Sequence, residues 1–161
     1  MDVYLVQHGA ALPTEQDPRR PLSEAGRAAV AKVAACLAAR GSHLIAPPIV
    51  EIRHSGKLRA QQTAEILGQA LCPQLRPQAV DHLAPDDDPG ALQSELESRR
   101  NEDTALMLVG HLPHLARLAG LLLAGDAARS PVRFANAAVL RLSFGRDGWA
   151  VDWYLPPACL P

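Results

Sequence analysis

Aromatic residues make up only 4% of this 161-residue chain, although hydrophobic residues account for 48% of it. The hydrophobic core must therefore be aliphatic, built mainly from Ala, Leu and Val. A chain of this length has enough apolar material to bury one core. We expect a single domain spanning residues 1–161.

Cysteines are few and widely separated. Cys36, Cys72 and Cys159 are odd in number and form no C-x-x-C pair, which argues against a disulfide framework and a structural zinc site. Long hydrophobic runs are also absent, since the most apolar stretch, residues 115–125, is interrupted by Arg117 and is shorter than the roughly 20 residues of a membrane span. The first residues lack the basic segment of a signal peptide. We therefore expect a cytoplasmic protein that does not bind membranes.

The chain also lacks an excess of either charge. Its 16 basic and 17 acidic residues give a formal net charge of −1, which provides no electrostatic basis for binding nucleic acid. Only Lys32 and Lys57 are lysines, and the other basic residues are arginines. In such a chain a single arginine is a weak indication of a site.

Hydrophobic runs and helix-capping residues alternate along the chain. Short apolar runs predict strands at 3–6, 49–52, 75–80 and 105–109. Helical spacing predicts helices between the cap Ser23 and Gly41, over 57–71, over 90–100, and from 110–113 to about 124. The runs 138–144 and 149–155, around Asp147-Gly148, predict a β-hairpin. The pattern indicates a three-layer α/β/α fold with a mostly parallel central sheet and the C-terminal hairpin at its edge.

Polar side chains directly follow three of the predicted strands. His8 follows the first strand and His111 follows the strand at 105–109. Because the carboxyl ends of parallel strands line the ligand crevice, we expect these rings to face one pocket. Ser55 is expected to cap the next helix, which would place Arg59 on the same rim as an anion-binding group. The alternatives are ordinary polar residues at strand ends and a solvated surface arginine.

Four segments occur in a distinctive order along the chain. They are Leu5-Val6-Gln7-His8-Gly9, Arg20-Pro21-Leu22-Ser23-Glu24-Ala25-Gly26, the segment from Ser55 to Thr63, and Gly110-His111-Leu112-Pro113. Together they resemble the motifs of the histidine phosphatase superfamily, which has the phosphoglycerate mutase-like fold. The short length resembles its SixA-type branch of phosphohistidine phosphatases, and the long insertion of the larger mutase branches is missing. The resemblance covers essentially the whole chain.

This resemblance implies a metal-independent phosphatase without a cofactor that acts on phosphohistidine in a signalling protein, for example a phosphotransfer domain. It implies that His8 is the nucleophile and is transiently phosphorylated. Arg59 and His111 would contact the phosphoryl oxygens, and Arg20 would be a second clamp. The pocket is expected to accept phosphate or sulfate. We expect a backbone carbonyl, such as that of Gly9, to orient the His8 ring.

Position 7 departs from the motif, because Gln7 stands where the family has Arg. Its amide can donate a hydrogen bond to a phosphoryl group but carries no charge. Removal of one electrostatic donor from an active site costs about 10²-fold or more in rate. A weakened or non-catalytic module that binds phosphohistidine or phosphate is therefore one alternative. A small-molecule phosphomonoesterase is another, although the missing insertion leaves little chain for a substrate lid.

No general acid stands out. Asp86, Asp87 and Asp88 are candidates, and a solvated acidic turn is the favoured alternative for them. A phosphohistidine substrate needs less acid catalysis than a phosphate ester, because its imidazole leaves easily once protonated.

The remaining histidines give weaker indications. His111 and His114 have a spacing seen in metal sites, but no carboxylate at suitable spacing joins them, so we expect no metal. His43, His54 and His82 are expected at surface or loop positions.

Overall fold

The computed structural model describes residues 1–41 and 44–161, so His43 lies outside the described residues. Within them, one sheet has the strand order β3-β2-β4-β1-β5-β6. The strands are β1 (Asp2–Gln7), β2 (Ile49–His54), β3 (Gln78–Ala79), β4 (Ala105–Gly110), β5 (Val139–Gly145) and β6 (Gly148–Leu155). The first four strands of this order run parallel, whereas β5 runs antiparallel to β1 and β6 antiparallel to β5.

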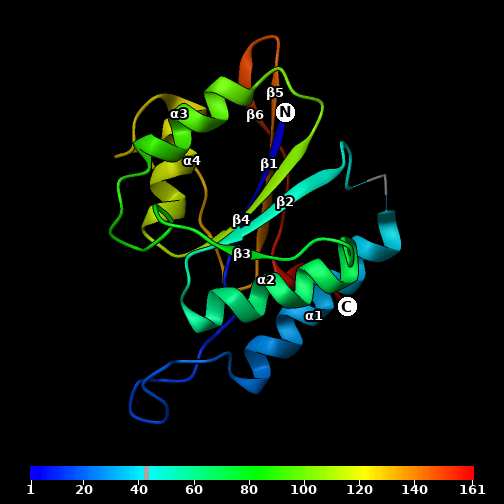
Figure 1. Cartoon of the computed structure of the whole chain (residues 1–161), viewed down its shortest axis with the longest axis vertical. Coiled ribbons are helices and arrows are strands. Elements are labelled where there is room, and N and C mark those ends of the chain that lie inside the picture. Colours follow the sequence, from blue (N-terminus) through cyan, green and yellow to red (C-terminus); the bar gives the residue numbers. More distant parts are fainter. Residues whose placement is uncertain (42–43) are drawn as a thin grey trace.

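Four helices among the described residues cover both faces of the sheet. They are α1 (Glu24–Arg40), α2 (Leu58–Leu71), α3 (Gly90–Arg99) and α4 (His114–Ala124). Helices α1 and α2 lie on one face, and α3 and α4 lie on the other (Figure 1). The predicted three-layer α/β/α fold, with its mostly parallel sheet and antiparallel hairpin at the edge, is confirmed.

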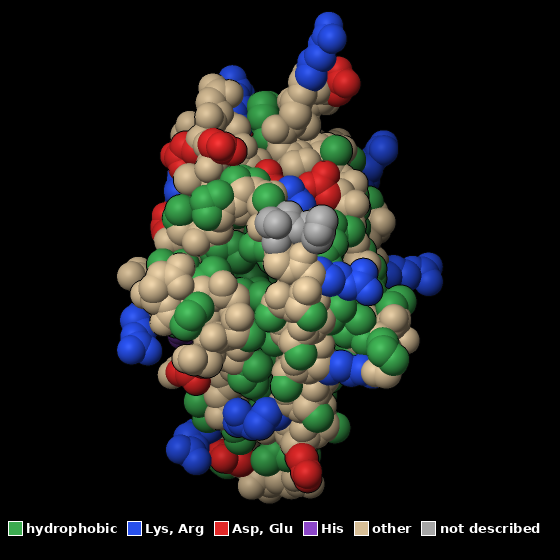
Figure 2. All heavy atoms as spheres, turned by 90° about the vertical axis from the view of Figure 1, so that its right-hand side faces the viewer, with side chains coloured by type: hydrophobic (Ala, Val, Ile, Leu, Met, Phe, Trp, Pro, Cys, Tyr) green, Lys and Arg blue, Asp and Glu red, His purple; other side chains and the backbone are tan. Residues whose placement is uncertain are grey.

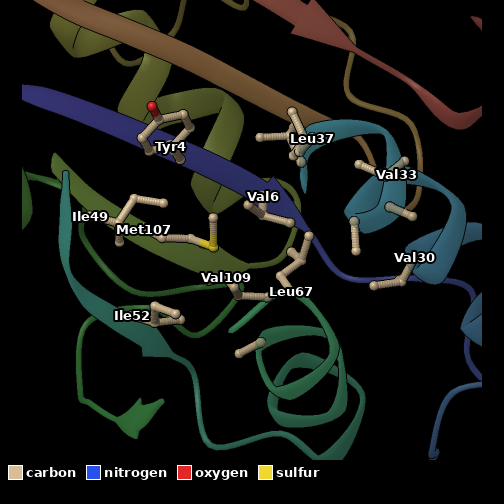
Figure 3. Packing of buried hydrophobic residues seen from close by; sticks show 14 of the residues in the cluster. Tyr4, Val6, Val30, Val33, Leu37, Ile49, Ile52, Leu67, Met107 and Val109 are labelled. Atoms are coloured by element: carbon tan, nitrogen blue, oxygen red, sulfur yellow. The ribbon is translucent and has the colours of Figure 1, made fainter. Parts of the chain in front are cut away.

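The core is aliphatic, as the composition predicts. Among the largest fully buried side chains of the described residues, Tyr4 is the one aromatic. Side chains alternate across β1, so Val6 packs toward α1 and α2 whereas Leu5 packs toward α3 and α4. Figure 3 shows the first of these two clusters between the strands and helices, with labels on Tyr4, Val6, Val30, Val33, Leu37, Ile49, Ile52, Leu67, Met107 and Val109.

One predicted element is shorter than expected, and one placement was wrong. The third strand, expected at 75–80, is present but contains only Gln78–Ala79, because Pro77 has no N–H to donate to the neighbouring strand. His54 is buried, at 5% exposure, because β2 continues through it, and its Nδ1 accepts a hydrogen bond from Gly56 N–H at 3.2 Å. His82 is exposed, as expected.

Charged side chains of both signs are scattered over the face seen in Figure 2 and do not gather into one basic patch there. Among the described residues, no helix combines the length and the hydrophobicity that crossing a bilayer requires.

The loop between β1 and α1 is held tightly against the start of α1. It projects from one edge of the sheet (Figure 1). Ser23 caps α1 by accepting a hydrogen bond from Gly26 N–H at 3.0 Å, and its own N–H donates to the Ala10 carbonyl at 2.9 Å. A Cβ on Gly26 would lie 2.0 Å from that carbonyl oxygen, and a Cβ on Gly9 would lie 2.8 Å from the Gly26 oxygen. These two glycines therefore permit a close approach of two backbone segments.

We predict that Gly26→Ala destabilises the protein by about 2 kcal/mol or more, although alanine is the better helix former, because the new methyl group collides with backbone. Urea denaturation of both proteins measures the effect. Gly145→Ala is the matched control, since open space surrounds that position. A Gly26→Ala protein as stable as the control variant would contradict the packing described.

Candidate active site

The carboxyl ends of three parallel strands bring the predicted site residues together. His8 follows β1, Ser55 follows β2 and His111 follows β4. The centroids of the two imidazole rings lie 4.7 Å apart. Arg59, the second residue of α2, reaches both rings. The site is thus assembled from segments about 50 residues apart in sequence.

The hydrogen bonds of His8 define which ring nitrogen carries the hydrogen. Nδ1 lies 2.6 Å from the carbonyl oxygen of Gly9, and Nε2 lies 3.1 Å from Nε of Arg59. A carbonyl can only accept and a guanidinium can only donate, so Nδ1 carries the hydrogen and Nε2 carries the lone pair. Burial lowers the pKa of His8, and the charges of Arg59 and Arg20 lower it further, while the Gly9 bond opposes them.

His111 is nearly fully buried, at 2% exposure, and both of its nitrogens have partners. Nε2 lies 2.5 Å from Oγ of Ser55, and Nδ1 lies 3.4 Å from a terminal nitrogen of Arg59. Because the guanidinium donates, Nδ1 is the acceptor and Nε2–H donates to Ser55. Burial is the main cause that lowers the pKa of His111 to about 3, and interactions with His8 and with the charged Arg59 lower it further. The ring is therefore neutral at pH 7.

Ser55 has a different role from the one predicted. Helix α2 begins at Leu58 after Lys57, and no side chain caps it. The chain turns through Gly56, whose φ is +72°, so Ser55 lies outside the helix and its hydroxyl contacts His111. The expectation that Ser55 is the helix cap was therefore wrong, and the sequence pattern did not identify its contact with His111.

The positive charge of the site comes from arginines. The Arg59 guanidinium joins the two histidines, and its pKa is lowered by burial and by Arg20 but stays far above neutrality. Arg20 donates from Nε to the Leu12 carbonyl at 3.3 Å, and its charge also lowers the pKa of His8. Both arginines therefore act electrostatically on the nucleophile candidate.

Comparison with known proteins finds relatives of similar sequence and fold. No protein-family model matches the chain. Over 163 residues, 99% of this chain and 96% of its relative, the sequence is 29% identical to the phosphohistidine phosphatase SixA of Escherichia coli strain K12. The structure of the protein histidine phosphatase SixA complexed with tungstate matches with a TM-score of 0.82 at 25% identity, covering 98% of each chain. A protein of Agrobacterium tumefaciens provisionally assigned as SixA matches with a TM-score of 0.71 at 27% identity, covering 97% of each chain.

Over almost its whole length the chain is similar in sequence and fold to SixA proteins.

Gln7, which departs from the motif that the chain resembles, has a partner of its own. Its amide nitrogen donates to Oδ1 of Asn136 at 2.7 Å. Asn136 precedes β5 and is 129 residues away in sequence, so no local pattern pointed to it. Next to it, the Ala137 N–H donates to the carbonyls of Gln7 at 3.0 Å and of His8 at 3.2 Å. This turn thus holds the end of the strand that carries His8.

In the acidic turn, residues 86–88, the carboxylates of Asp87 and Asp88 accept hydrogen bonds from nearby backbone N–H groups. Asp87 accepts a hydrogen bond from Ala84 N–H at 2.7 Å, and Asp88 accepts one from Gly90 N–H at 3.0 Å. Among the hydrogen bonds of the described residues, none joins these carboxylates or that of Asp86 to the histidine pair or to the guanidinium. The geometry favours a structural turn.

His114 is fully buried on α4, and neither of its ring nitrogens has a hydrogen-bonding partner among the described residues. Burial is the main cause of its lowered pKa, which Asp87 and Asp88 oppose. Both nitrogens of His111 are already engaged by protein groups. Within residues 1–41 and 44–161, no group of three or more His, Cys, Asp or Glu side chains could hold a metal ion.

We predict that the protein loses stability as the pH falls below about 6.5. The folded-state pKa of His111, about 3, is below that of the unfolded chain, so the unfolded chain binds the proton first. Between these two values His111 contributes a loss of about 1.4 kcal/mol per pH unit. In His111→Gln the free energy of unfolding should therefore decline less steeply between pH 6 and pH 5, as measured by denaturant titration.

The control for this prediction is Gln74→Asn, because Gln74 is exposed and the substitution removes no titrating group, so the slope should be unchanged. Equal slopes in His111→Gln and the unmodified protein would show that His111 is not held neutral by burial.

Proposed function

We propose that this protein is a phosphohistidine phosphatase that transfers the phosphoryl group of a partner protein to His8 and then to water. The observation that carries this proposal is the fixed tautomer of His8, with its lone pair on Nε2 beside the Arg59 guanidinium. The similarity to SixA, and the tungstate bound by one such structure, support an anion as the ligand of this pocket.

The proposed reaction has two displacements at phosphorus. In the first, the substrate imidazole carries a proton from solvent on its unphosphorylated nitrogen, Nε2 of His8 attacks phosphorus, a P–N bond forms, and the P–N bond to the substrate breaks as a neutral imidazole leaves. In the second, water attacks phosphorus, the bond to Nε2 breaks, and the water protons are shared between the released phosphate and solvent. Every group in this scheme is a side chain of the protein, the substrate or water.

Arg59 changes partners in this scheme. In the free protein it donates to Nε2 of His8, which keeps that nitrogen unprotonated. An arriving phosphoryl group offers charged oxygens, which are stronger acceptors for a guanidinium than an imidazole. Arg59 then releases the lone pair of His8 Nε2 and binds the phosphoryl oxygens. Arg20 acts as a second clamp on these oxygens, and the neutral His111 offers them a further polar contact. A bound phosphoryl group also raises the pKa of His111, because an anion favours the charged ring.

The partner proposed is a phosphohistidine-bearing protein, such as a phosphotransfer domain. A protonated imidazole leaves without a strong general acid, and the carboxylates of the acidic turn are bound to their own backbone. These features support a phosphoramidate substrate over a phosphate ester. We further infer that residues 1–161 act as one domain, because β1 at the start of the chain pairs with β5 near its end.

We predict that His8→Ala lowers the turnover of a phosphohistidine peptide at least about 10³-fold, since the nucleophile is removed. Arg59→Ala should cost about 10²–10³-fold, as the loss of one electrostatic donor does elsewhere. Release of inorganic phosphate measures both. Arg146→Ala, an exposed arginine at the tip of the hairpin, is the control and should match the unmodified protein. Full activity of His8→Ala would refute the covalent route.

We predict that Gln7→Arg raises kcat/KM on phosphohistidine by up to about 10²-fold, because a cation then faces the transferred group. The double variant Gln7→Arg with His8→Ala should stay inactive and serves as the control. If the unmodified protein is inert and Gln7→Arg activates it, the alternative of a phosphohistidine- or phosphate-binding module is correct. Hydrolysis of sugar phosphates without phosphohistidine turnover would instead support a small-molecule phosphomonoesterase.

A further inference from the structure

Thr63 lies behind the site, on α2, one turn after Arg59, and is fully buried. Its hydroxyl group accepts a hydrogen bond from Gly9 N–H at 3.1 Å and donates one to the Arg59 carbonyl at 2.7 Å. The hydroxyl therefore connects the loop after the nucleophile strand to the helix that carries the guanidinium.

Four hydrogen bonds close a ring through this hydroxyl. His8 Nδ1–H donates to the Gly9 carbonyl, Gly9 N–H donates to Thr63, Thr63 donates to the Arg59 carbonyl, and Arg59 Nε donates to His8 Nε2. Both nitrogens of the imidazole are thus held by one connected set of bonds. Thr63 is the member of this ring that has no direct contact with the imidazole.

The two hydrogen bonds made by Thr63 differ in whether another group could replace the hydroxyl. A helical threonine commonly donates to the carbonyl four residues earlier, and the helix supplies that carbonyl with a backbone bond as well. The bond from Gly9, 54 residues away, has no such substitute. Gly9 is buried, and a Cβ there would lie 2.8 Å from both the Gly26 oxygen and Val30 Cγ2. Its N–H cannot turn to water without moving the loop.

We propose that Thr63 is a positioning residue that holds Gly9 so that its carbonyl keeps His8 in the Nδ1–H tautomer, with Nε2 aimed for attack. This inference rests on the proposed function. Because α2 holds Arg59 independently, loss of the Thr63 hydroxyl acts on the attack by His8 and leaves the binding of an anion by the guanidinium largely intact.

The test compares Thr63→Val, which keeps the shape and removes the hydroxyl, with Thr63→Ser, which keeps the hydroxyl. For Thr63→Val we expect kcat on a phosphohistidine peptide to fall about 10–10²-fold, as outer hydrogen-bond partners and small misplacements cost elsewhere. We expect KM and the tungstate Kd to stay within about 3-fold, because the anion contacts themselves are unchanged. Thr63→Ser should retain kcat within about 3-fold on the same reasoning.

Nitrogen-15 NMR of the His8 imidazole supplies a readout that loss of stability alone would not change. The spectra are recorded in an Arg59→Ala background, because the Arg59 guanidinium alone would keep Nε2 unprotonated. In that background Arg59→Ala alone and Arg59→Ala with Thr63→Ser should show hydrogen on Nδ1, and Arg59→Ala with Thr63→Val should show a mixture of both tautomers. An unchanged tautomer in the folded Arg59→Ala, Thr63→Val protein overturns the proposal, as does a loss in Thr63→Val that is confined to tungstate affinity. If the unmodified protein hydrolyses no phosphohistidine, the proposed function fails, while the tautomer in the double variants still decides the role of Thr63.

Discussion

The hydrogen bond from Nδ1 of His8 to the Gly9 carbonyl, 2.6 Å long, leaves the lone pair of the ring on Nε2, the nitrogen that reacts in the proposed function. That carbonyl stays in place because the loop that carries it is packed against α1, where side chains at Gly9 and Gly26 would collide with backbone. The loop in turn depends on the sheet, since β1 lies between β4 and β5 and is buried on both faces. The fold therefore serves the site by fixing one peptide group relative to one imidazole.

Within the pocket, burial keeps the histidines neutral and the arginines supply the positive charge. Desolvation lowers the pKa of both histidines, so neither adds a charge at neutral pH, and the positive potential is left to Arg59 and Arg20. The proposed anion site is therefore compatible with a chain whose net charge is −1, because it needs only these two arginines beside the histidines. Position 7 adds no further charge. The motif has an arginine there, whereas this chain has Gln7, which donates a hydrogen bond to Asn136.

The sequence alone predicts the parts of the structure that follow from local rules. Alternating strands and helices gave the three layers, and Ser23 was correctly placed as the cap of α1 because its spacing to Gly26 is local. The rule that strand ends share an edge placed His8 beside His111. The features that the sequence did not predict depend on tertiary contacts. Ser55 resembles a helix cap in sequence, and only the turn at Gly56 directs it elsewhere.

The same limit applies to the residues around His8. Asn136 reaches Gln7 across 129 residues, and Thr63 reaches Gly9 across 54, so neither contact leaves a periodic signal in the sequence. These two contacts form only in the folded protein. Pairing of β1 with β5 brings Asn136 to Gln7, and packing of α2 against the sheet brings Thr63 to Gly9. Thr63 at least lies within a segment that resembles a family motif, whereas Asn136 lies in none of them.

The most direct measurement is the identity of the phosphorylated nitrogen at residue 8. The protein would be mixed with a phosphohistidine peptide, quenched rapidly in base, and the phosphohistidine isomer at His8 assigned by phosphorus and nitrogen NMR. The hydrogen bond between Nδ1 and Gly9 predicts a phosphoryl group on Nε2. A phosphoryl group on Nδ1, or turnover with no phosphate on His8, would contradict the account.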